Sequence, residues 1–305
     1  MFVSWLSPAS LFNSYLRRSF GAAGLSSQTI PIDDQTTIHF WGPKPDSPRA
    51  NPTKPALVLI HGFGPAALWQ WRPQAAALSP HFDLYVPDLV FFGESTTASA
   101  ERTERFQAAC VGKLMERVGV EKYSVAGTSY GGFVAYRMAE MWGERVEKVV
   151  VASSGVNMVR GDGEKLLRRA AAETVEEFLL PQTAEQLRVL LGLALFKRPA
   201  VLPSFLLTDF IHKLYTENRM EKIELLRDVS FGKDDTPKIS PLKQEVLIVW
   251  GEHDQIFLLE MATQLKELLG EKTQLAVMKN TSHMPQVEDP ANFNAIVKNF
   301  LCGST

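Results

Sequence analysis

The chain has 305 residues, of which 45% are hydrophobic and 22% are charged, and its formal net charge is -2. This composition is typical of a soluble globular protein with a large core, and it excludes disordered, collagen-like and coiled-coil chains. The 32 basic residues are balanced by 34 acidic ones and form no basic stripe, so we expect no nucleic-acid partner.

The first 30 residues are predicted to form an amphipathic N-terminal extension. Residues 9–20 predict a short helix that docks on the domain or makes weak contact with a membrane surface. Its apolar side chains at helical spacing are Leu11, Phe12, Tyr15, Leu16 and Phe20. Residues 1–32 also contain seven serines, two arginines and no acidic residue, a bias typical of an organelle transit peptide.

From residue 56 onward, short apolar runs alternate with helical patterns. Strands are predicted at residues 56–60, 82–86, 122–126, 146–152, 245–250 and 273–278. Helices are predicted at residues 69–78, 103–118, 130–141, 258–269 and 290–301. Uniformly apolar strands that alternate with helices predict an α/β fold with a mainly parallel, doubly wound sheet. We expect residues 42–55, which are rich in Pro and Gly, to form a surface loop.

Residues 157–240 interrupt this alternation, because they contain no convincing strand. Capping-box patterns at residues 174–177 and 183–186 each open an apolar helical run. We therefore predict a helical cap over residues 157–240, inserted into a core that consists of residues 31–156 and 241–305.

A G-x-S-x-G pattern, residues 127–131, directly follows one predicted strand and precedes a helix. A tight turn of this kind exposes the side chain of Ser129 at the carboxyl end of the sheet, and small residues are needed two positions before and after it. The helix that begins beside Ser129 adds a positive dipole end, which favours an attacking alkoxide and a developing oxyanion. Ser129 is the predicted nucleophile.

A serine nucleophile needs a base and a carboxylate that orients the base. Asp254 follows the strand at residues 245–250, and His283 lies between the last strand and the last helix. The carboxyl ends of parallel strands share one edge of the sheet, so we expect Ser129, Asp254 and His283 to meet there. Glu252, Glu288 and Asp289 are rival acids, and Glu252 is the first of them to test.

The pattern His61-Gly62-Phe63-Gly64 follows the predicted strand at residues 56–60. Its glycines let the backbone turn toward the nucleophile, so the N–H groups of Phe63 and Tyr130 are predicted to form the oxyanion hole. We expect His61 itself to make structural hydrogen bonds in this turn.

These motifs, together with Pro87-Asp88, Gly251-Glu252-His253-Asp254 and Ser282-His283-Met284-Pro285, resemble those of the α/β-hydrolase fold superfamily. The resemblance covers nearly all of the chain from about residue 30. It is greatest to a plant branch related to monoacylglycerol-lipase-like hydrolases and to carbon-carbon bond (meta-cleavage product) hydrolases. It implies a helical cap between the sixth and seventh strands and no cofactor.

Departures from these relatives favour ester chemistry. Epoxide hydrolases and haloalkane dehalogenases of this fold carry an aspartate where this chain has Ser129. Meta-cleavage product hydrolases usually show Gly-Pro-Gly in the oxyanion segment and a tryptophan soon after the catalytic histidine, whereas this chain has Gly64-Pro65-Ala66 and Met284-Pro285. We therefore expect a serine esterase or lipase-like enzyme. Carbon-carbon bond hydrolysis, ligand reception and acyl transfer are the alternatives.

The residues predicted to face the substrate are mostly aromatic, which favours a moderately hydrophobic small molecule or lipid. They are Phe63, Trp69, Phe91, Phe92, Tyr130, Met158 and Met284.

The only two cysteines, Cys110 and Cys302, lie far apart in the sequence and belong to no CxxC or Cys/His cluster. This excludes a disulfide framework and a zinc site, so we expect no metal. A reducing compartment, the cytoplasm, is the predicted location, and the chloroplast or mitochondrion is the alternative.

Overall fold

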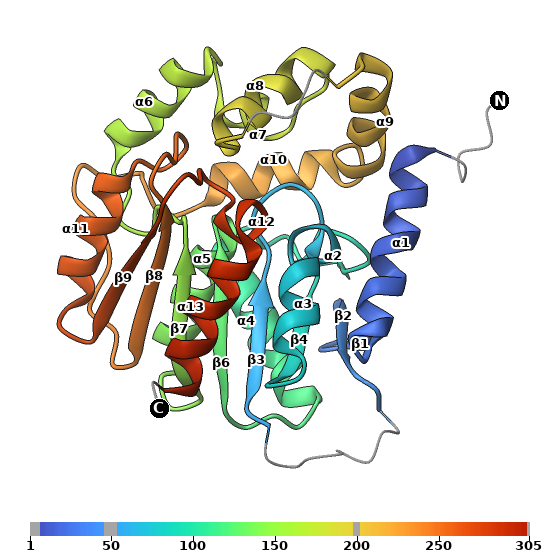
Figure 1. The fold of residues 1–305 in the computed structure, drawn as a ribbon, viewed down its shortest axis with the longest axis vertical. Coiled ribbons are helices and arrows are strands. Elements are labelled where there is room, and N and C mark those ends of the chain that lie inside the picture. The colour runs from blue at the N-terminus through green and yellow to red at the C-terminus, as the bar shows by residue number, and fades with distance from the viewer. Residues whose placement is uncertain (1–6, 46–53, 198–201, 304–305) are drawn as a thin grey trace.

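A nine-stranded sheet runs through the computed structural model, which describes residues 7–45, 54–197 and 202–303 (Figure 1). The strands are β1 (Leu25–Pro31), β2 (Thr36–Pro43), β3 (Ala56–Ile60), β4 (Asp83–Pro87), β5 (Thr96–Thr97), β6 (Tyr123–Thr128), β7 (Val146–Ala152), β8 (Glu245–Gly251) and β9 (Thr273–Met278). Their order is β1-β2-β4-β3-β6-β7-β8-β9, and β5 pairs with β2. All pairings from β4 to β9 are parallel, whereas β1, β2 and β5 pair antiparallel.

Two apolar cores lie on opposite faces of this sheet. Successive side chains of a strand point to opposite faces, so Val58 and Ile60 of β3 enter one core while Leu57 and Leu59 enter the other. The first core is covered by α4 (Glu104–Arg117), α5 (Tyr130–Met141) and α11 (Leu259–Leu269). The second is covered by α1 (Pro8–Ala22), α3 (Arg72–Leu78) and α13 (Pro290–Cys302). This burial on both faces explains why the central strands are continuously apolar.

Five helices form the segment between β7 and β8 and lie across one end of the sheet (Figure 1). They are α6 (Arg160–Ala170), α7 (Val175–Leu179), α8 (Ala184–Ala194), α9 (Ser204–Leu214) and α10 (Arg219–Asp228). Without the two-residue β5, the flanking strands are the sixth and seventh of the chain. The predicted fold class, a mainly parallel sheet with a helical cap inserted at this point, is confirmed.

Some elements differ from the prediction. β1 and β2 were not expected; β1 is an edge strand of seven residues, four of which are consecutive polar residues, so it lacks an apolar run. β1 pairs with β2 along its full length, so the boundary predicted at residue 30 falls inside a strand. The helix predicted at residues 69–78 is two helices, α2 (Ala67–Gln70) and α3, because the chain bends at Trp71 and Pro73 starts a new helix. A short helix, α12 (Pro285–Glu288), was also not predicted.

The predicted N-terminal helix is present as α1, but its apolar side chains divide between two faces. Leu16 and Phe20 are buried, whereas Leu11, Phe12 and Tyr15 are 57%, 42% and 47% exposed. The cause is helical geometry: residues at i, i+4 and i+7 share a face, and Leu11 and Tyr15 lie on the opposite one from Leu16 and Phe20. Among the described residues, no helix has both the length and the apolar character needed to cross a membrane. Most of the loop predicted at residues 42–55 lies outside the described residues.

Candidate active site

Ser129 occupies a strained turn between β6 and α5. Its backbone has φ 52° and ψ −121°, a conformation that non-glycine residues rarely adopt. The neighbouring glycines make this turn possible: a Cβ on Gly127 would lie 2.0 Å from the carbonyl oxygen of Gly131, and one on Gly131 would lie 2.3 Å from that of Ile60. The sequence pattern predicted this requirement correctly.

The three residues predicted as a catalytic triad form one hydrogen-bonded relay. His283 Nε2 lies 3.0 Å from Ser129 Oγ, and His283 Nδ1 lies 3.0 Å and 3.2 Å from the two carboxylate oxygens of Asp254. His283 and Asp254 are buried, and Ser129 is partly exposed. The geometry is that of a hydroxyl beside a base whose far side is held by a carboxylate.

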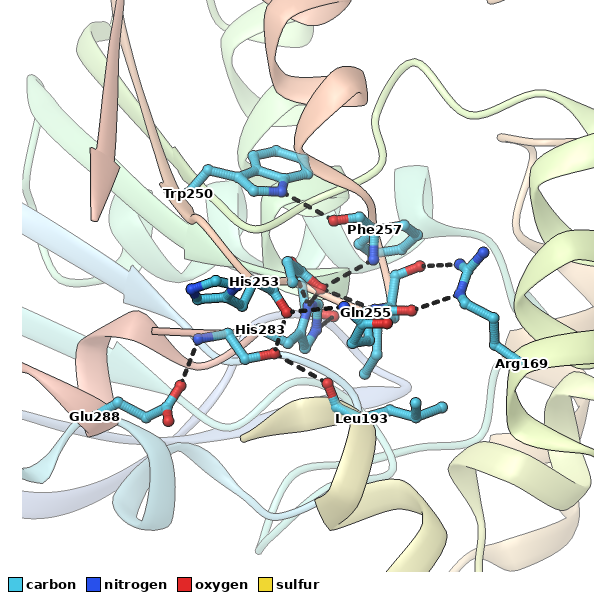
Figure 2. Close-up of polar contacts among 12 residues, drawn as sticks. Arg169, Leu193, Trp250, His253, Gln255, Phe257, His283 and Glu288 are labelled. Carbon is cyan, nitrogen blue, oxygen red and sulfur yellow. Dashed lines mark hydrogen bonds and ion pairs between the residues drawn. The ribbon is translucent and has the colours of Figure 1, made fainter. Parts of the chain in front are cut away.

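The loop that carries Asp254 is held from within and from the cap. Asp254 Oδ1 accepts hydrogen bonds from the backbone N–H groups of Ile256 and Phe257, at 2.8 and 3.0 Å. Arg169 of α6 donates to the carbonyl oxygens of Gln255 and Ile256 (Figure 2). A helix of the cap therefore helps to position the carboxylate.

The loop that carries His283 is tied to the other end of the cap (Figure 2). The Ser282 hydroxyl lies 3.0 Å from the carbonyl oxygens of both Leu193 of α8 and His253, and the Ser282 N–H donates to Glu288. The second carboxylate oxygen of Glu288 accepts from the N–H of Phe196, just beyond α8. Sequence analysis missed Ser282 and Arg169, because their contacts are made to the backbone of distant loops.

The predicted oxyanion turn lies against the nucleophile. A Cβ on Gly62 would be 3.0 Å from the Cβ of Ser129. Gln70 of α2 clamps this turn: its Oε1 accepts from the Gly62 N–H at 2.8 Å, and its Nε2 donates to the carbonyl oxygens of Gly62 and Pro65. Gln70 is a residue that sequence analysis missed, although a polar residue between two tryptophans, Trp69 and Trp71, was a signal.

The backbone N–H groups of Phe63 and Tyr130 are available as donors. Within the described ranges, neither donates a hydrogen bond to a protein acceptor. Their rings meet edge to face with centroids 5.8 Å apart, so the two residues are neighbours. Their role as an oxyanion hole stays a prediction.

His61 makes the structural contacts expected of it. Its Nδ1 lies 2.8 Å from the Gly62 carbonyl oxygen, and its Nε2 accepts from the N–H of Leu89 at 3.0 Å. These partners require a neutral ring with the proton on Nδ1. Burial lowers the pKa of His61, which also favours the neutral ring.

The residues predicted to line the pocket separate into two groups. Beside the oxyanion turn, the ring of Phe63 contacts the ring of Phe92 on one side and the ring of Tyr130 on the other. Phe91, with φ 73°, packs instead under the guanidinium of Arg102 at 4.5 Å.

The remaining members of that set have other partners. The Trp69 indole donates to Asn13 of α1 and meets the ring of Phe210 in α9. Met158 lies against Gly232, beyond α10, and Met284 precedes α12. Their place in the pocket stays a prediction.

The rival acids and bases have other contacts among the described residues. Glu252 lies 3.5 Å from His253 Nε2, and the His253 ring stacks on Phe196 at 4.5 Å, with the rings 14° from parallel. Glu288 holds backbone N–H groups, as above, and Asp289 caps α13. Across the described ranges, no group of three or more His, Cys, Asp or Glu side chains is arranged to hold a metal ion.

A second serine-histidine-aspartate relay lies elsewhere in the molecule. Ser27 Oγ of β1 is 2.7 Å from His39 Nε2, and His39 Nδ1 is 2.8 Å from Asp88 Oδ2. Ser27 lies within a strand of ordinary extended conformation, and no helix begins beside it. Relay distances alone therefore do not distinguish Ser129. The strained turn and the adjacent start of α5 do.

The comparisons with known proteins agree with this architecture. A family model described as alpha/beta hydrolase fold matches residues 55–290. This chain belongs to the alpha/beta hydrolase fold family. The predicted superfamily and the predicted similarity to meta-cleavage product hydrolases are thus confirmed.

Three similar proteins illustrate the range of this hydrolase family. A dihydrolipoyllysine-residue acetyltransferase component of an acetoin cleaving system from Cupriavidus necator is 27% identical over 252 residues, and the match covers 81% of this chain and 63% of that relative. The chain thus spans less than two thirds of that relative's length. A 2-hydroxy-6-oxo-6-phenylhexa-2,4-dienoate hydrolase from Burkholderia cepacia is 25% identical over 264 residues, covering 81% of this chain and 87% of the relative. A bacterial membrane phospholipase A superposes with a TM-score of 0.80 at 23% identity, covering 97% of this chain and 92% of that one.

Proposed function

We propose that this protein is a serine hydrolase that cleaves a carboxylic ester of a moderately hydrophobic small molecule or lipid through an acyl-enzyme. The observation that carries the proposal is the Ser129–His283–Asp254 relay at a strained turn, beside the N-terminus of α5 and the turn that contains Phe63. Among the serines that the structure describes, Ser129 alone combines a relay with a position where a developing negative charge is stabilised.

In the proposed reaction, His283 Nε2 removes the proton from Ser129 Oγ as the oxygen attacks the ester carbonyl carbon. The carbonyl oxygen becomes an oxyanion that accepts hydrogen bonds from the N–H groups of Phe63 and Tyr130. The C–O bond then breaks, and the leaving alcohol takes the proton from His283. Water, deprotonated by His283, attacks the acyl-enzyme and releases the carboxylic acid and Ser129. Asp254 keeps the Nδ1 proton of His283 in place throughout.

Carbon-carbon bond hydrolysis of the meta-cleavage type is the second candidate. The relationship to the Burkholderia hydrolase favours it. Ester hydrolysis is preferred because Gly64-Pro65-Ala66 and Met284-Pro285 depart from the pattern usual in that group. Acyl transfer to an alcohol and ligand reception are further alternatives on the same fold. We also propose that the chain belongs to the plant-type, monoacylglycerol-lipase-like branch of the family.

The proposed setting is the cytoplasm, with the chloroplast or mitochondrion as the alternative. Two free cysteines, one buried and one exposed, support a reducing compartment. The exposed Leu11, Phe12 and Tyr15 of α1 support weak contact with a lipid surface.

The test is labelling of the purified protein with a fluorophosphonate, which modifies an activated serine. We expect labelling of the wild type and of Ser27→Ala, the matched control from the second relay, and none of Ser129→Ala. Turnover of p-nitrophenyl esters should follow the same pattern, and their chain-length preference would measure the pocket. Labelling that persists in Ser129→Ala, or a folded wild type that neither labels nor turns over esters, would overturn the proposal.

A further inference from the structure

Lys222 is a buried lysine in the cap, the fourth residue of α10. Only 4% of its surface is exposed. Its ammonium makes no hydrogen bond or ion pair within the described part of the chain, and it lies over the ring of Phe92, 5.0 Å from the ring centroid, in a cation–π contact. Such a contact offsets only part of the cost of burying a charge, and a buried lysine without an anionic partner is rare.

The same ring leads from Lys222 to the oxyanion turn. Phe92 contacts Phe63 with ring centroids 5.2 Å apart and His61 with centroids 5.1 Å apart. Asn218, the residue before α10, donates to the carbonyl oxygen of Phe91 at 3.1 Å. The start of α10 is thus fixed against the loop that carries Phe92, and one aromatic ring separates the ammonium from the oxyanion turn.

Positive charge gathers at this end of α10. Arg219 lies one turn before Lys222 on the same helix face and is only partly exposed. Its guanidinium also has no hydrogen bond or ion pair to the residues that the structure describes. Burial lowers the pKa of both side chains, that of Lys222 to about 8. The N-terminus of a ten-residue helix adds a positive dipole end.

No acidic side chain of the described residues forms an ion pair with Lys222 or Arg219. The charges of Glu217 and Glu221 act to raise the pKa of Lys222, but the effect of burial is larger. Glu104, the buried carboxylate of α4, is occupied by Arg137 and Ser230. The N–H donors of Lys222 and Arg219 therefore have no hydrogen-bond acceptor among the described residues.

We propose that Lys222, flanked by Arg219, binds an anionic group of the substrate, so that the enzyme prefers esters that carry a carboxylate or phosphate remote from the scissile carbonyl. The inference rests on the proposed function, since it assigns the substrate class of the Ser129 site. Phe63, which is partly exposed, would contact the apolar chain between the two ends. Lys222 is a specificity-determining residue in this scheme and takes no part in proton transfer.

The experiment compares kcat/KM for pairs of p-nitrophenyl esters matched in length, one ending in a carboxylate and one in a methyl group: glutarate with pentanoate, and adipate with hexanoate. The readout is the ratio within a pair, so a general loss of activity cancels. We expect the wild type to prefer the carboxylate esters and Lys222→Met to lower that ratio about 30-fold, the effect of removing one partner of a buried charge pair. Lys222→Arg should retain most of the preference, and Lys213→Met, on the exposed face of α9, should retain all of it.

Inhibition of pentanoate hydrolysis by free glutarate and by inorganic phosphate distinguishes the two anions and also detects an anionic group on the alcohol side. The wild-type preference should fall as the pH rises through about 8, where Lys222 loses its proton, and should persist in Lys222→Arg. The charged and titratable groups that face Lys222 are Glu217, Arg219 and Glu221 of the cap and His61 of the core.

Equal ratios in the wild type and Lys222→Met, together with no Lys222-dependent inhibition by either anion, would overturn the anion site. Fluorophosphonate labelling of Ser129 and hydrolysis of the neutral esters would be unaffected by that outcome. Loss of both labelling and ester turnover in the wild type would instead overturn the proposed function.

Discussion

Replacing Lys222 with methionine should stabilise the folded protein at neutral pH. The lysine side chain is 4% exposed and has no ion pair among the described residues, so the desolvation of its charge on folding is offset only in part, by the cation–π contact with Phe92. Methionine has a similar length and shape, and it fills the same space beside Phe92 without a charge. A residue retained at the expense of stability is typical of functional sites.

The magnitude follows from the pKa of Lys222, which burial lowers from 10.5 to about 8. At about 1.4 kcal/mol per pKa unit, this corresponds to at most about 3.5 kcal/mol. Below pH 8 both the folded and the unfolded chain bind the proton, and the folded state carries the full penalty. Between about pH 8 and 10.5 only the unfolded chain binds it, so the stability of the wild type rises relative to that of the variant. The advantage of Lys222→Met should therefore be largest at pH 7 and vanish near pH 10.5.

Thermal unfolding monitored by circular dichroism from pH 6 to 10.5 tests this. A gain of about 1 to 3 kcal/mol should raise the Tm of Lys222→Met by roughly 2 to 8 °C at pH 7. Lys213→Met, which removes an exposed charge, serves as the control and should shift the Tm by less than about 1 °C. A Tm at pH 7 equal to or below that of the wild type would refute the reasoning, because it would show that the ammonium is solvated or paired.

Three further substitutions test the site. Gly127→Ala should prevent folding or destabilise the protein by about 3 kcal/mol or more, since its Cβ would lie 2.0 Å from a backbone oxygen. Soluble yield and Tm measure this effect. Gly161→Ala, whose Cβ meets nothing within 4 Å, is the control and should behave as wild type. Asp254→Asn should keep the fold, because the amide oxygen still accepts from the N–H groups of Ile256 and Phe257. It should lower kcat about 10³- to 10⁴-fold, because the amide favours the wrong tautomer of His283. A loss under tenfold would show that another acid orients His283. Gln70→Leu removes the clamp on the oxyanion turn, so kcat should fall roughly 10- to 100-fold with little change in KM; an effect on Tm alone would reduce Gln70 to a structural role.

The sequence by itself was sufficient for the sheet, the cap and the position of Ser129. β3 is uniformly apolar and β7 is apolar from Val149 to Ala152, and both strands have the bounds predicted for them. The turn at Ser129 follows from steric exclusion between residues 127 and 131, which is local and therefore visible in a short pattern. The edge strand β1 was missed because it is half exposed and stabilised by its pairing with β2, which a local pattern does not encode.

Only the tertiary structure decided which distant side chains meet. Asp254, and not Glu252 or Glu288, reaches His283, because the ends of β8 and β9 lie side by side and the hydrogen bonds of their loops fix each carboxylate. The clamp from Gln70 and the contacts of Arg169 and Ser282 depend on backbone atoms of other segments, which carry no sequence signal. In sequence, Lys222 is one more charged residue of a polar helix. Its significance comes from burial without an ion pair among the described residues, which is a property of the packed chain and not of the residue.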